Sequence, residues 1–278
     1  MSDISRKISG FRAVILNFYQ EHGRSLAWRQ TSDVYEVAVS EFMLQQTQVS
    51  RVQDKYASFL SRFPTAHSLA SASQKDVLVA WQGLGYNRRA LWLQGLAQFL
   101  TSNPSPSYDE LLSVKGVGPY TAAAICSFAN NDDVAAIDVN ISRIFDRYFN
   151  RSDKEFISQV LPASRSRDWH NALMDFGSLV CTKRSPSCDS CPLAQSCHAY
   201  QNNTFSKEKS SSQPRFEGSV RWHRGQVLKA LLKNSRTKEQ LWYFLDEKYR
   251  DHNKFETALE QYLDEEFIVE DNDLFVIK

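Results

Sequence analysis

The sequence predicts a mainly α-helical protein with a small separate domain at its C-terminus. Apolar residues recur at helical spacing through the first 200 residues, and strand-like runs are almost absent before residue 218. Residues 201–217 are polar and rich in serine, which is typical of a linker. A length of 278 residues suits about two domains, at roughly 150 residues each. We therefore expect one domain at residues 1–200 and a second at residues 218–278.

The helices of the first domain are predicted from their apolar stripes and end signals. A stripe that starts at Phe11 stops at Gly23, and one long helix is predicted from Val34 to near Pro64. Ser73, with Asp76 three residues later, resembles a capping box at the start of the next helix. The remaining helices are predicted at residues 77–81, 89–100, 108–114, 119–128, 139–149 and 169–180.

The second domain combines three short helical patterns with a terminal hairpin. Two apolar runs flank Asp271, Asn272 and Asp273, which predicts two strands joined by a turn. Three helices and a hairpin resemble a winged helix. The third helical pattern, near residues 254–267, ends in three acidic residues that would repel phosphates. We expect this domain to contact a protein partner or to cover the first domain; the alternative is DNA contact through its first helix, near Arg221, Arg224 and Lys229.

The composition is that of an ordinary globular protein. Hydrophobic residues make up 42% and charged residues 23%, which excludes collagen-like and disordered chains. No apolar run approaches the roughly 20 residues that cross a bilayer, and the N-terminus lacks the apolar core of a signal peptide, so a soluble cytoplasmic protein is expected. The net charge is +1, but residues 218–278 carry a balance of −2, so an anionic ligand is expected on the first domain.

Four of the five cysteines fall within seventeen residues. A secreted disulfide framework would spread its cysteines along the chain, so the cluster favours a metal centre in a reducing compartment. The spacing is C-x6-C-x2-C-x5-C, with one close pair only, whereas a structural zinc site usually has two. The fifth cysteine, Cys126, lies among alanines and is expected to be a buried apolar thiol. The candidate ligands are Cys181, Cys188, Cys191 and Cys197.

A tight turn with two glycines joins two of the predicted helices. Gly116 and Gly118 let backbone amides approach a ligand closely, and Pro119 suits the first turn of a helix. Free amides at a helix N-terminus favour a phosphate. The pattern resembles a helix-hairpin-helix that clamps the DNA backbone; the alternative is a plain helical hairpin. Two basic residues between the first two clustered cysteines, Lys183 and Arg184, are further candidates for phosphate contact.

Two carboxylates in unlike surroundings suggest acid–base chemistry. Glu41 is flanked by apolar residues, so its protonated form is favoured and it is a candidate general acid, although a lone Glu on a helix is usually only solvated. Asp138 precedes a helix, where it is expected to act as an N-cap and stay ionised. One acid and one anion are the pair needed to hydrolyse an N-glycosidic bond. Gln45, Gln46 and Thr47, which follow Glu41, carry donors and acceptors suited to base edges.

These segments resemble the MutY-like adenine DNA glycosylases of the helix-hairpin-helix, or endonuclease III, superfamily. The resemblance covers roughly residues 8–200 and is carried by LAWR, VSEFMLQQTQV, WQGLGYNRRA, GVGPYTAAAI, IDVNISRIFDRYF, MDFGSLVC and the cysteine loop. It implies a helix-hairpin-helix glycosylase fold, with a six-helix part at about residues 30–135 and a cluster part at about residues 1–29 and 136–200. It also implies that the four cysteines hold a 4Fe-4S cluster.

The resemblance implies roles for individual residues in base excision. Glu41 protonates the adenine and serves the water step, Asp138 stabilises the oxocarbenium ion, and Asn140 helps to hold that geometry. Gln46 and Tyr86 match positions that enter the double helix near the opposite base. The expected partner is double-stranded DNA with a mispair, bound by a monomer that is associated with the nucleoid if the source is prokaryotic.

The residue at position 120 separates relatives that only remove a base from relatives that also cut the DNA backbone. Relatives that also cut the backbone have a lysine there that forms a Schiff base, which tyrosine cannot do, so no lyase activity is expected. Tyrosine also occurs in thymine glycosylases, so removal of thymine or uracil opposite guanine is an alternative. Another alternative is a non-catalytic iron-sulfur protein that binds DNA or senses redox state. The roughly 60 residues after the linker are too few for the MutT-like domain of full-length relatives, which leaves recognition of 8-oxoguanine open.

Overall fold

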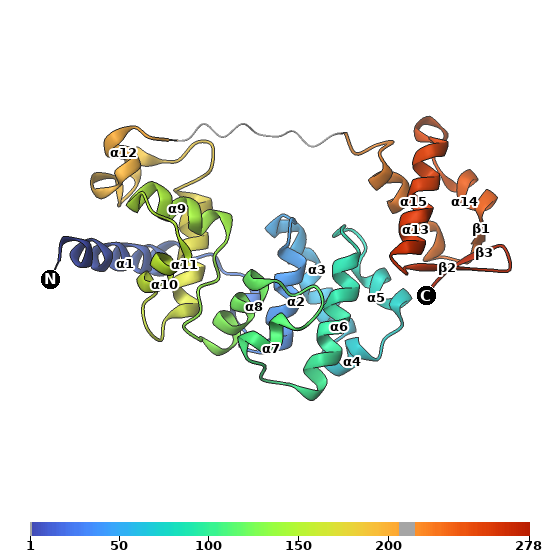
Figure 1. The fold of residues 1–278 in the computed structure, drawn as a ribbon, viewed down its shortest axis with the longest axis horizontal. Coiled ribbons are helices and arrows are strands. Elements are labelled where there is room, and N and C mark those ends of the chain that lie inside the picture. Colours follow the sequence, from blue (N-terminus) through green and yellow to red (C-terminus); the bar gives the residue numbers. More distant parts are fainter. Residues whose placement is uncertain (1, 206–214) are drawn as a thin grey trace. The chain divides into compact units, whose positions relative to one another are not determined.

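The structure is a computed structural model that describes residues 2–205 and 215–278. The described residues fall into two compact units, one within residues 1–71 and 84–208 and the other within residues 72–83 and 209–278. The first unit is helical, as Figure 1 shows. Its α-helices are α1 (Asp3–His22), α2 (Val34–Leu44), α3 (Val49–Arg62), α4 (Ala66–Ala70), α6 (Arg88–Ser102), α7 (Tyr108–Leu112), α8 (Pro119–Ile125), α9 (Val139–Phe149), α10 (Lys154–Val160), α11 (Ser166–Leu179) and α12 (His198–Asn202).

One core of the first unit joins the start of the chain to helices far along it. Helix α1 packs along α11, and α11 packs against α9 (Figure 1). The fully buried ring of Phe11 stacks on Tyr148 at 4.7 Å between centroids and meets Phe145 and Trp169 edge to face. Burial of such aromatic surface stabilises this arrangement and fixes the place of α9.

The long helix predicted from Val34 to near Pro64 is wrong, because the chain breaks between α2 and α3. Gln46 has a φ of 54°, a left-handed conformation that ends α2. The break also places Thr47 N–H on the carbonyl of Leu44, at 3.2 Å. Apolar periodicity continues across the break, so the stripe alone did not reveal it.

The other predicted helix ends agree well with the structure. Helix α1 ends at the residue before Gly23, and α9 covers the predicted residues 139–149. Helix α5 (Gln74–Trp81) begins after Ser73, whose hydroxyl accepts from Asp76 N–H at 3.0 Å. The predicted helix at residues 119–128 changes at Cys126 into a π-helical turn, Cys126–Asn130. Short 3₁₀ turns lie at Ala27–Arg29, Cys188–Ser190, Ala194–Ser196 and Glu247–Tyr249.

The described residues beyond 214 have the element order of a winged helix. They form α13 (Val220–Leu231), β1 (Arg236–Thr237), α14 (Lys238–Phe244), α15 (His252–Asp264), β2 (Ile268–Asp271) and β3 (Leu274–Ile277). The antiparallel sheet has the order β1-β3-β2, and the sequence had not revealed the two-residue β1. Asn272 and Asp273 both have positive φ, as a tight hairpin turn requires, which confirms the predicted hairpin.

Arg224 is engaged inside this second unit. Its guanidinium donates to both carboxylate oxygens of Glu265, at 2.9 and 2.6 Å, and to Gln261 at 2.9 Å. This ion pair engages one of the three side chains named for DNA contact by the first helix, whereas Arg221 and Lys229 are exposed.

The predicted linker at residues 201–217 is described only in part. Gln201 and Asn202 end α12, and residues 206–214 lie outside the described residues. Among the helices of the described ranges, none has the length and apolar character to cross a membrane.

Candidate active site

Helix α2 holds Glu41 in an apolar environment. Asp33 caps the helix by accepting from Glu36 N–H at 2.9 Å, and α2 is then buried on nearly every side. Only 6% of Glu41 is exposed. Burial raises the pKa of the Glu41 carboxyl, a hydrogen bond from Tyr120 lowers it, and the nearby charge of Asp138 raises it; together they bring this pKa to about 7. A carboxyl with this pKa exchanges its proton near neutral pH, as a general acid requires.

Tyr120 lies beside Glu41 on the first turn of α8. The hairpin between α7 and α8 fixes its place, since Pro119 is the first residue of the helix. Burial and the two neighbouring carboxylates raise the pKa of the Tyr120 phenol well above its usual value. The phenol therefore stays neutral and donates to Glu41.

Asp138 is the N-cap of α9 and accepts three hydrogen bonds. Its Oδ1 accepts from the backbone N–H groups of Asn140, at 2.9 Å, and Ile141, at 2.7 Å. Its Oδ2 accepts from the Asn140 side-chain amide at 2.7 Å. These donors lie at the N-terminus of α9, where a carboxylate caps the helix. Asn140 holds the orientation of that carboxylate.

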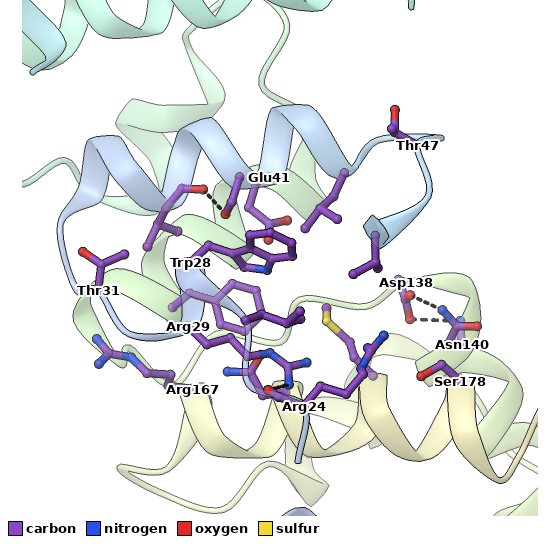
Figure 2. A pocket seen from close by; sticks show the side chains of 18 of the residues that line it. Arg24, Trp28, Arg29, Thr31, Glu41, Thr47, Asp138, Asn140, Arg167 and Ser178 are labelled. Carbon is purple, nitrogen blue, oxygen red and sulfur yellow. Dashed lines mark hydrogen bonds between the residues drawn. The ribbon is translucent and has the colours of Figure 1, made fainter. Parts of the chain in front are cut away.

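One pocket brings these side chains together, as Figure 2 shows. Glu41, Tyr120, Asp138, Asn140 and Thr47 all line it. One acid with a raised pKa and one carboxylate in a polar setting thus face a common space. Two carboxyl groups in such different environments can act as an acid and an anion, here Glu41 and Asp138 respectively.

Most of the other residues that line this pocket were not candidates from the sequence alone. Arg29 donates two hydrogen bonds of 2.8 Å to Asp175, whose side chain is fully buried, and Arg24 donates to the same carboxylate. The LAWR and MDFG segments contain Arg29 and Asp175, but only the fold brings the two together. The remaining polar residues of the lining are Thr31, Ser40, Arg167, Asn171 and Ser178, with Trp28 as its largest ring.

His170 supports the segment that leads to Asp138. Its Nδ1 lies 2.7 Å from the carbonyl oxygen of Ser166 and must carry the proton, so Nε2 accepts from Ala136 N–H at 3.0 Å. Burial lowers the pKa of His170 to about 4, so the ring is neutral. The sequence around His170 does not have the spacing of a metal-binding motif. Only the fold shows that its ring contacts Ala136, two residues before Asp138.

The two hairpin glycines serve different purposes. Gly116 has a φ of 90°, and a Cβ there would lie 2.4 Å from the ring of Trp92. Gly118 is the exposed N-cap of α8, has an ordinary φ of −92°, and has open space at its Cβ position. Gly116 is therefore required by the turn, whereas Gly118 leaves room for a ligand above the amides of α8.

Substitution by alanine is expected to separate these two roles. Gly116→Ala combines a strained φ with a clash and should lower the melting temperature by several degrees, about 1–3 kcal/mol of stability. Gly118→Ala should leave the melting temperature within about 1 °C of the wild type. Calorimetry checks both values, and equal melting temperatures for the two variants would contradict the distinction.

The residues considered for base contact divide into exposed and internal ones. Gln46 and Tyr86 are exposed at the tips of two turns, and both have positive φ, 54° and 46°. Gln45 instead turns inward and donates to the hydroxyl of Thr121 at 3.3 Å. Thr47 lies half-buried at the edge of the pocket.

The four clustered cysteines line one small cavity. Its walls include Ile144, Phe176 and Leu193, and all four cysteines are free thiols. Arg147 donates to Cys181 Sγ at 3.4 Å, and Cys197 Sγ donates to the carbonyl of Arg147 at 3.3 Å. Within the described ranges, no three His, Cys, Asp or Glu side chains meet closely enough to hold one metal ion. A four-iron cluster needs one thiolate for each iron, and four cysteines around an apolar cavity fit it.

Cys126 lies apart from this group, on the π-helical turn. Only 1% of it is exposed, and burial raises the pKa of its thiol to about 11. It is a buried apolar thiol, as the sequence analysis predicted.

A basic groove borders the pocket on the α9 side. Three basic residues, Arg143, Arg147 and Lys183, and one acidic residue, Asp146, line it, and it shares Tyr120 and Asp138 with the pocket. Lys183 is exposed, as is Arg184, which does not line the groove. The groove therefore has one more basic than acidic residue and leads to Asp138.

Comparison with known sequences identifies relatives over most of the chain. The profile of the HhH-GPD superfamily base excision DNA repair proteins matches residues 39–161. The adenine DNA glycosylase of Mycolicibacterium smegmatis is 34% identical over 231 residues, which cover 78% of each protein. That of Buchnera aphidicola (Baizongia pistaciae) is 36% identical over 69% of this chain, and that of Homo sapiens 33% identical over 70%. The chain spans 59% of the Buchnera protein and 40% of the human one.

Solved structures share the fold. A thermostable thymine-DNA glycosylase superposes with a TM-score of 0.69 at 26% identity, over 72% of this chain and all of that one. An endonuclease III bound to DNA superposes with a TM-score of 0.59 at 20% identity, over 70% and 98% of the two chains.

Proposed function

Because the chain belongs to the adenine DNA glycosylase family of the HhH-GPD superfamily, we propose that it removes adenine from mispaired DNA by hydrolysis. The observation that carries this proposal is the pocket in which Glu41, with a pKa near 7, faces the capped carboxylate of Asp138. The paired base would have to be flipped out of the duplex to reach that pocket.

Glu41 supplies the proton in the proposed mechanism. A protonated carboxyl in an apolar pocket gives its proton to a ring nitrogen of the adenine, which makes the base a better leaving group. The carboxylate left behind then accepts a proton from the attacking water. Tyr120 donates to Glu41 and so stabilises the charge that the carboxyl gains in this step.

Asp138 stabilises the sugar after the glycosidic bond weakens. Positive charge develops on the deoxyribose as the base departs, and a fixed carboxylate lowers the energy of that state. The backbone N–H groups of Asn140 and Ile141 and the Asn140 amide hold this carboxylate in place. Because Tyr120 has no amine to form a Schiff base, the proposed reaction stops at the abasic site.

We assign a 4Fe-4S cluster to Cys181, Cys188, Cys191 and Cys197 by their spacing and common cavity. When bound, the cluster would act as a structural brace, held by these four cysteines of the loop between α11 and α12. Arg147 on α9 binds the carbonyls of Thr182 and Lys183, at 2.7 and 2.9 Å, so an ordered loop presents Lys183 to the basic groove. We propose that this groove and the hairpin amides hold the DNA backbone.

Replacement of one of the four proposed cysteine ligands should remove the cluster and weaken DNA binding, and should have less effect on the chemical step. The purified protein is expected to contain about four irons per chain and to be brown. Cys191→Ala should lose that iron and weaken duplex binding, whereas Cys126→Ala should keep both. Metal analysis and a binding titration check this, and one zinc without iron would overturn the assignment.

A glycosylase assay tests the proposed activity and its second candidate. The likeness to a thymine-DNA glycosylase at 26% identity favours thymine removal as that second candidate, whereas the adenine DNA glycosylases match at 30–36%. Duplexes that pair A, T or U with G, 8-oxoguanine or C are incubated with the protein and then treated with alkali to cut abasic sites. Cleavage at A opposite G or 8-oxoguanine is expected. Cleavage only at T or U opposite G would establish the second candidate, and no cleavage at all would refute both.

The winged-helix unit is proposed to serve protein contact. Exposed acidic side chains include Asp264 at the end of α15, Glu270 on β2 and Asp273 in the hairpin turn. Such a surface repels phosphates, so the unit is not expected to enlarge the DNA-binding surface.

A further inference from the structure

Two exposed turns of the first unit, residues 45–48 and 84–87, share one buried cation. The guanidinium of Arg89, on the first turn of α6, lies between them, and only 4% of Arg89 is exposed. Its Nη1 donates to three carbonyls at the end of α2: those of Phe42 at 2.6 Å, Met43 at 3.1 Å and Gln45. A cation at a helix C-terminus is stabilised by the helix dipole and satisfies carbonyls that have no partner within the helix.

The other end of the same guanidinium holds the second turn. Nη2 donates to the carbonyls of Leu84, at 3.2 Å, and Gly85, at 3.0 Å, and to the hydroxyl of Thr47 at 3.2 Å. That hydroxyl also lies 3.3 Å from the carbonyl oxygen of Gln45 and 3.5 Å from that of Leu84, and it can donate its one proton to either. One side chain thus cross-links two loops that lie about forty residues apart in the sequence.

Each turn presents one exposed side chain from a strained backbone. Gln46 and Tyr86 have left-handed φ values, which cost energy for residues other than glycine and persist only where the surroundings hold them. Arg89 N–H donates to the carbonyl of Tyr86 at 2.9 Å, and the guanidinium lies 5.5 Å from the Tyr86 ring. The network around Arg89 is the contact that links both tips.

We propose that Arg89 is a positioning residue for duplex opening: it locks the two turns into one surface that presents Gln46 and Tyr86 to a disrupted base pair, and does not itself touch DNA. The inference rests on the proposed glycosylase function. Arg89 is too buried to contact a base directly. Its guanidinium donates to six acceptors, at the end of α2 and on the two turns, so its role is to position these segments. Lysine has the charge but not the planar fork, so it cannot serve both loops at once.

Single-turnover adenine release on two duplexes tests this proposal. In one duplex adenine is paired with guanine, and in the other it stands opposite an abasic site, so that no pair has to be opened. Arg89→Lys should release adenine from the A·G duplex on the order of 10- to 100-fold more slowly than the wild type, and within about 3-fold of it from the abasic duplex. The matched control is Arg88→Lys, an exposed neighbour, which should stay close to wild type on both.

A second variant covers the case in which Arg89→Lys does not fold. Thr47→Val keeps the cation but removes the hydroxyl that Arg89 binds, and should release adenine from the A·G duplex about 3- to 10-fold more slowly. Because Thr47 also lines the pocket, Thr47→Ser, which keeps the hydroxyl, is its control and should stay close to the wild type. An equal loss on both duplexes would overturn the inference, because it would show that Arg89 acts on Glu41 through α2. Wild-type speed on both duplexes would overturn it as well.

Failure of the proposed function gives a different result. In that case the wild type releases no adenine from either duplex. The inference is then judged by binding: Arg89→Lys, but not Arg88→Lys, should lose the preference for a mispaired over a matched duplex. An unchanged preference would overturn it.

Discussion

Glu41→Gln is expected to slow adenine release by about 10²- to 10⁴-fold, because the amide cannot give up a proton to the base. Duplex affinity should change by less than about 3-fold, since Glu41 is buried in the pocket and the amide is similar in size. Single-turnover kinetics and a binding titration measure the two effects. Release at near wild-type speed would refute the role of Glu41 as the acid.

Glu41→Gln is expected to raise the stability of the protein at high pH, although it slows the reaction. The pKa of Glu41 is about 7 in the folded state and near 4.5 in the unfolded chain, so the folded state binds the proton more tightly. The contribution of Glu41 to stability is therefore greatest below about pH 4.5 and is lost as pH rises through 7, by about 3 kcal/mol at most. Glu41→Gln removes this loss and should melt at a higher temperature than the wild type at pH 8 but not at pH 4.5. Glu21→Gln, on exposed α1 surface, is the matched control.

Asp138→Asn is expected to slow base release by about 10²- to 10³-fold, because a fixed negative charge beside the sugar is lost. Asparagine caps helices about as well as aspartate, so α9 should begin at the same residue and the melting temperature should change little. The result would thus separate charge stabilisation from the capping bonds to Asn140 and Ile141. Chemical-quench kinetics and calorimetry measure both.

A matched control is available at another helix start. Asp153 caps α10 by accepting from Phe156 N–H at 3.0 Å, and it does not line the pocket. Asp153→Asn should release adenine at the wild-type rate. A rate for Asp138→Asn close to that control would show that Asp138 acts only as a cap.

The sequence was informative where a local pattern has a local physical cause. Helix ends at Gly23, Ser73 and Asp138 follow from capping chemistry within three or four residues, and the hairpin at Asn272 follows from turn residues that tolerate positive φ. The cysteine spacing and the segments around Glu41 and Asp138 were also legible in one dimension. They predicted the family, and the related proteins confirm it.

Only the tertiary structure decided how distant segments meet. The break at Gln46 is absent from the apolar periodicity, and the last carbonyls of α2 are satisfied by Arg89, more than forty residues away. The pKa of Glu41 depends on the packing around α2 and on Tyr120, and the orientation of the segment before Asp138 depends on His170. The sequence by itself determined which residues have the chemistry of an acid, an anion and four thiols. The fold determined their distances, burial and charge state, because those arise from side chains that no local pattern brings together.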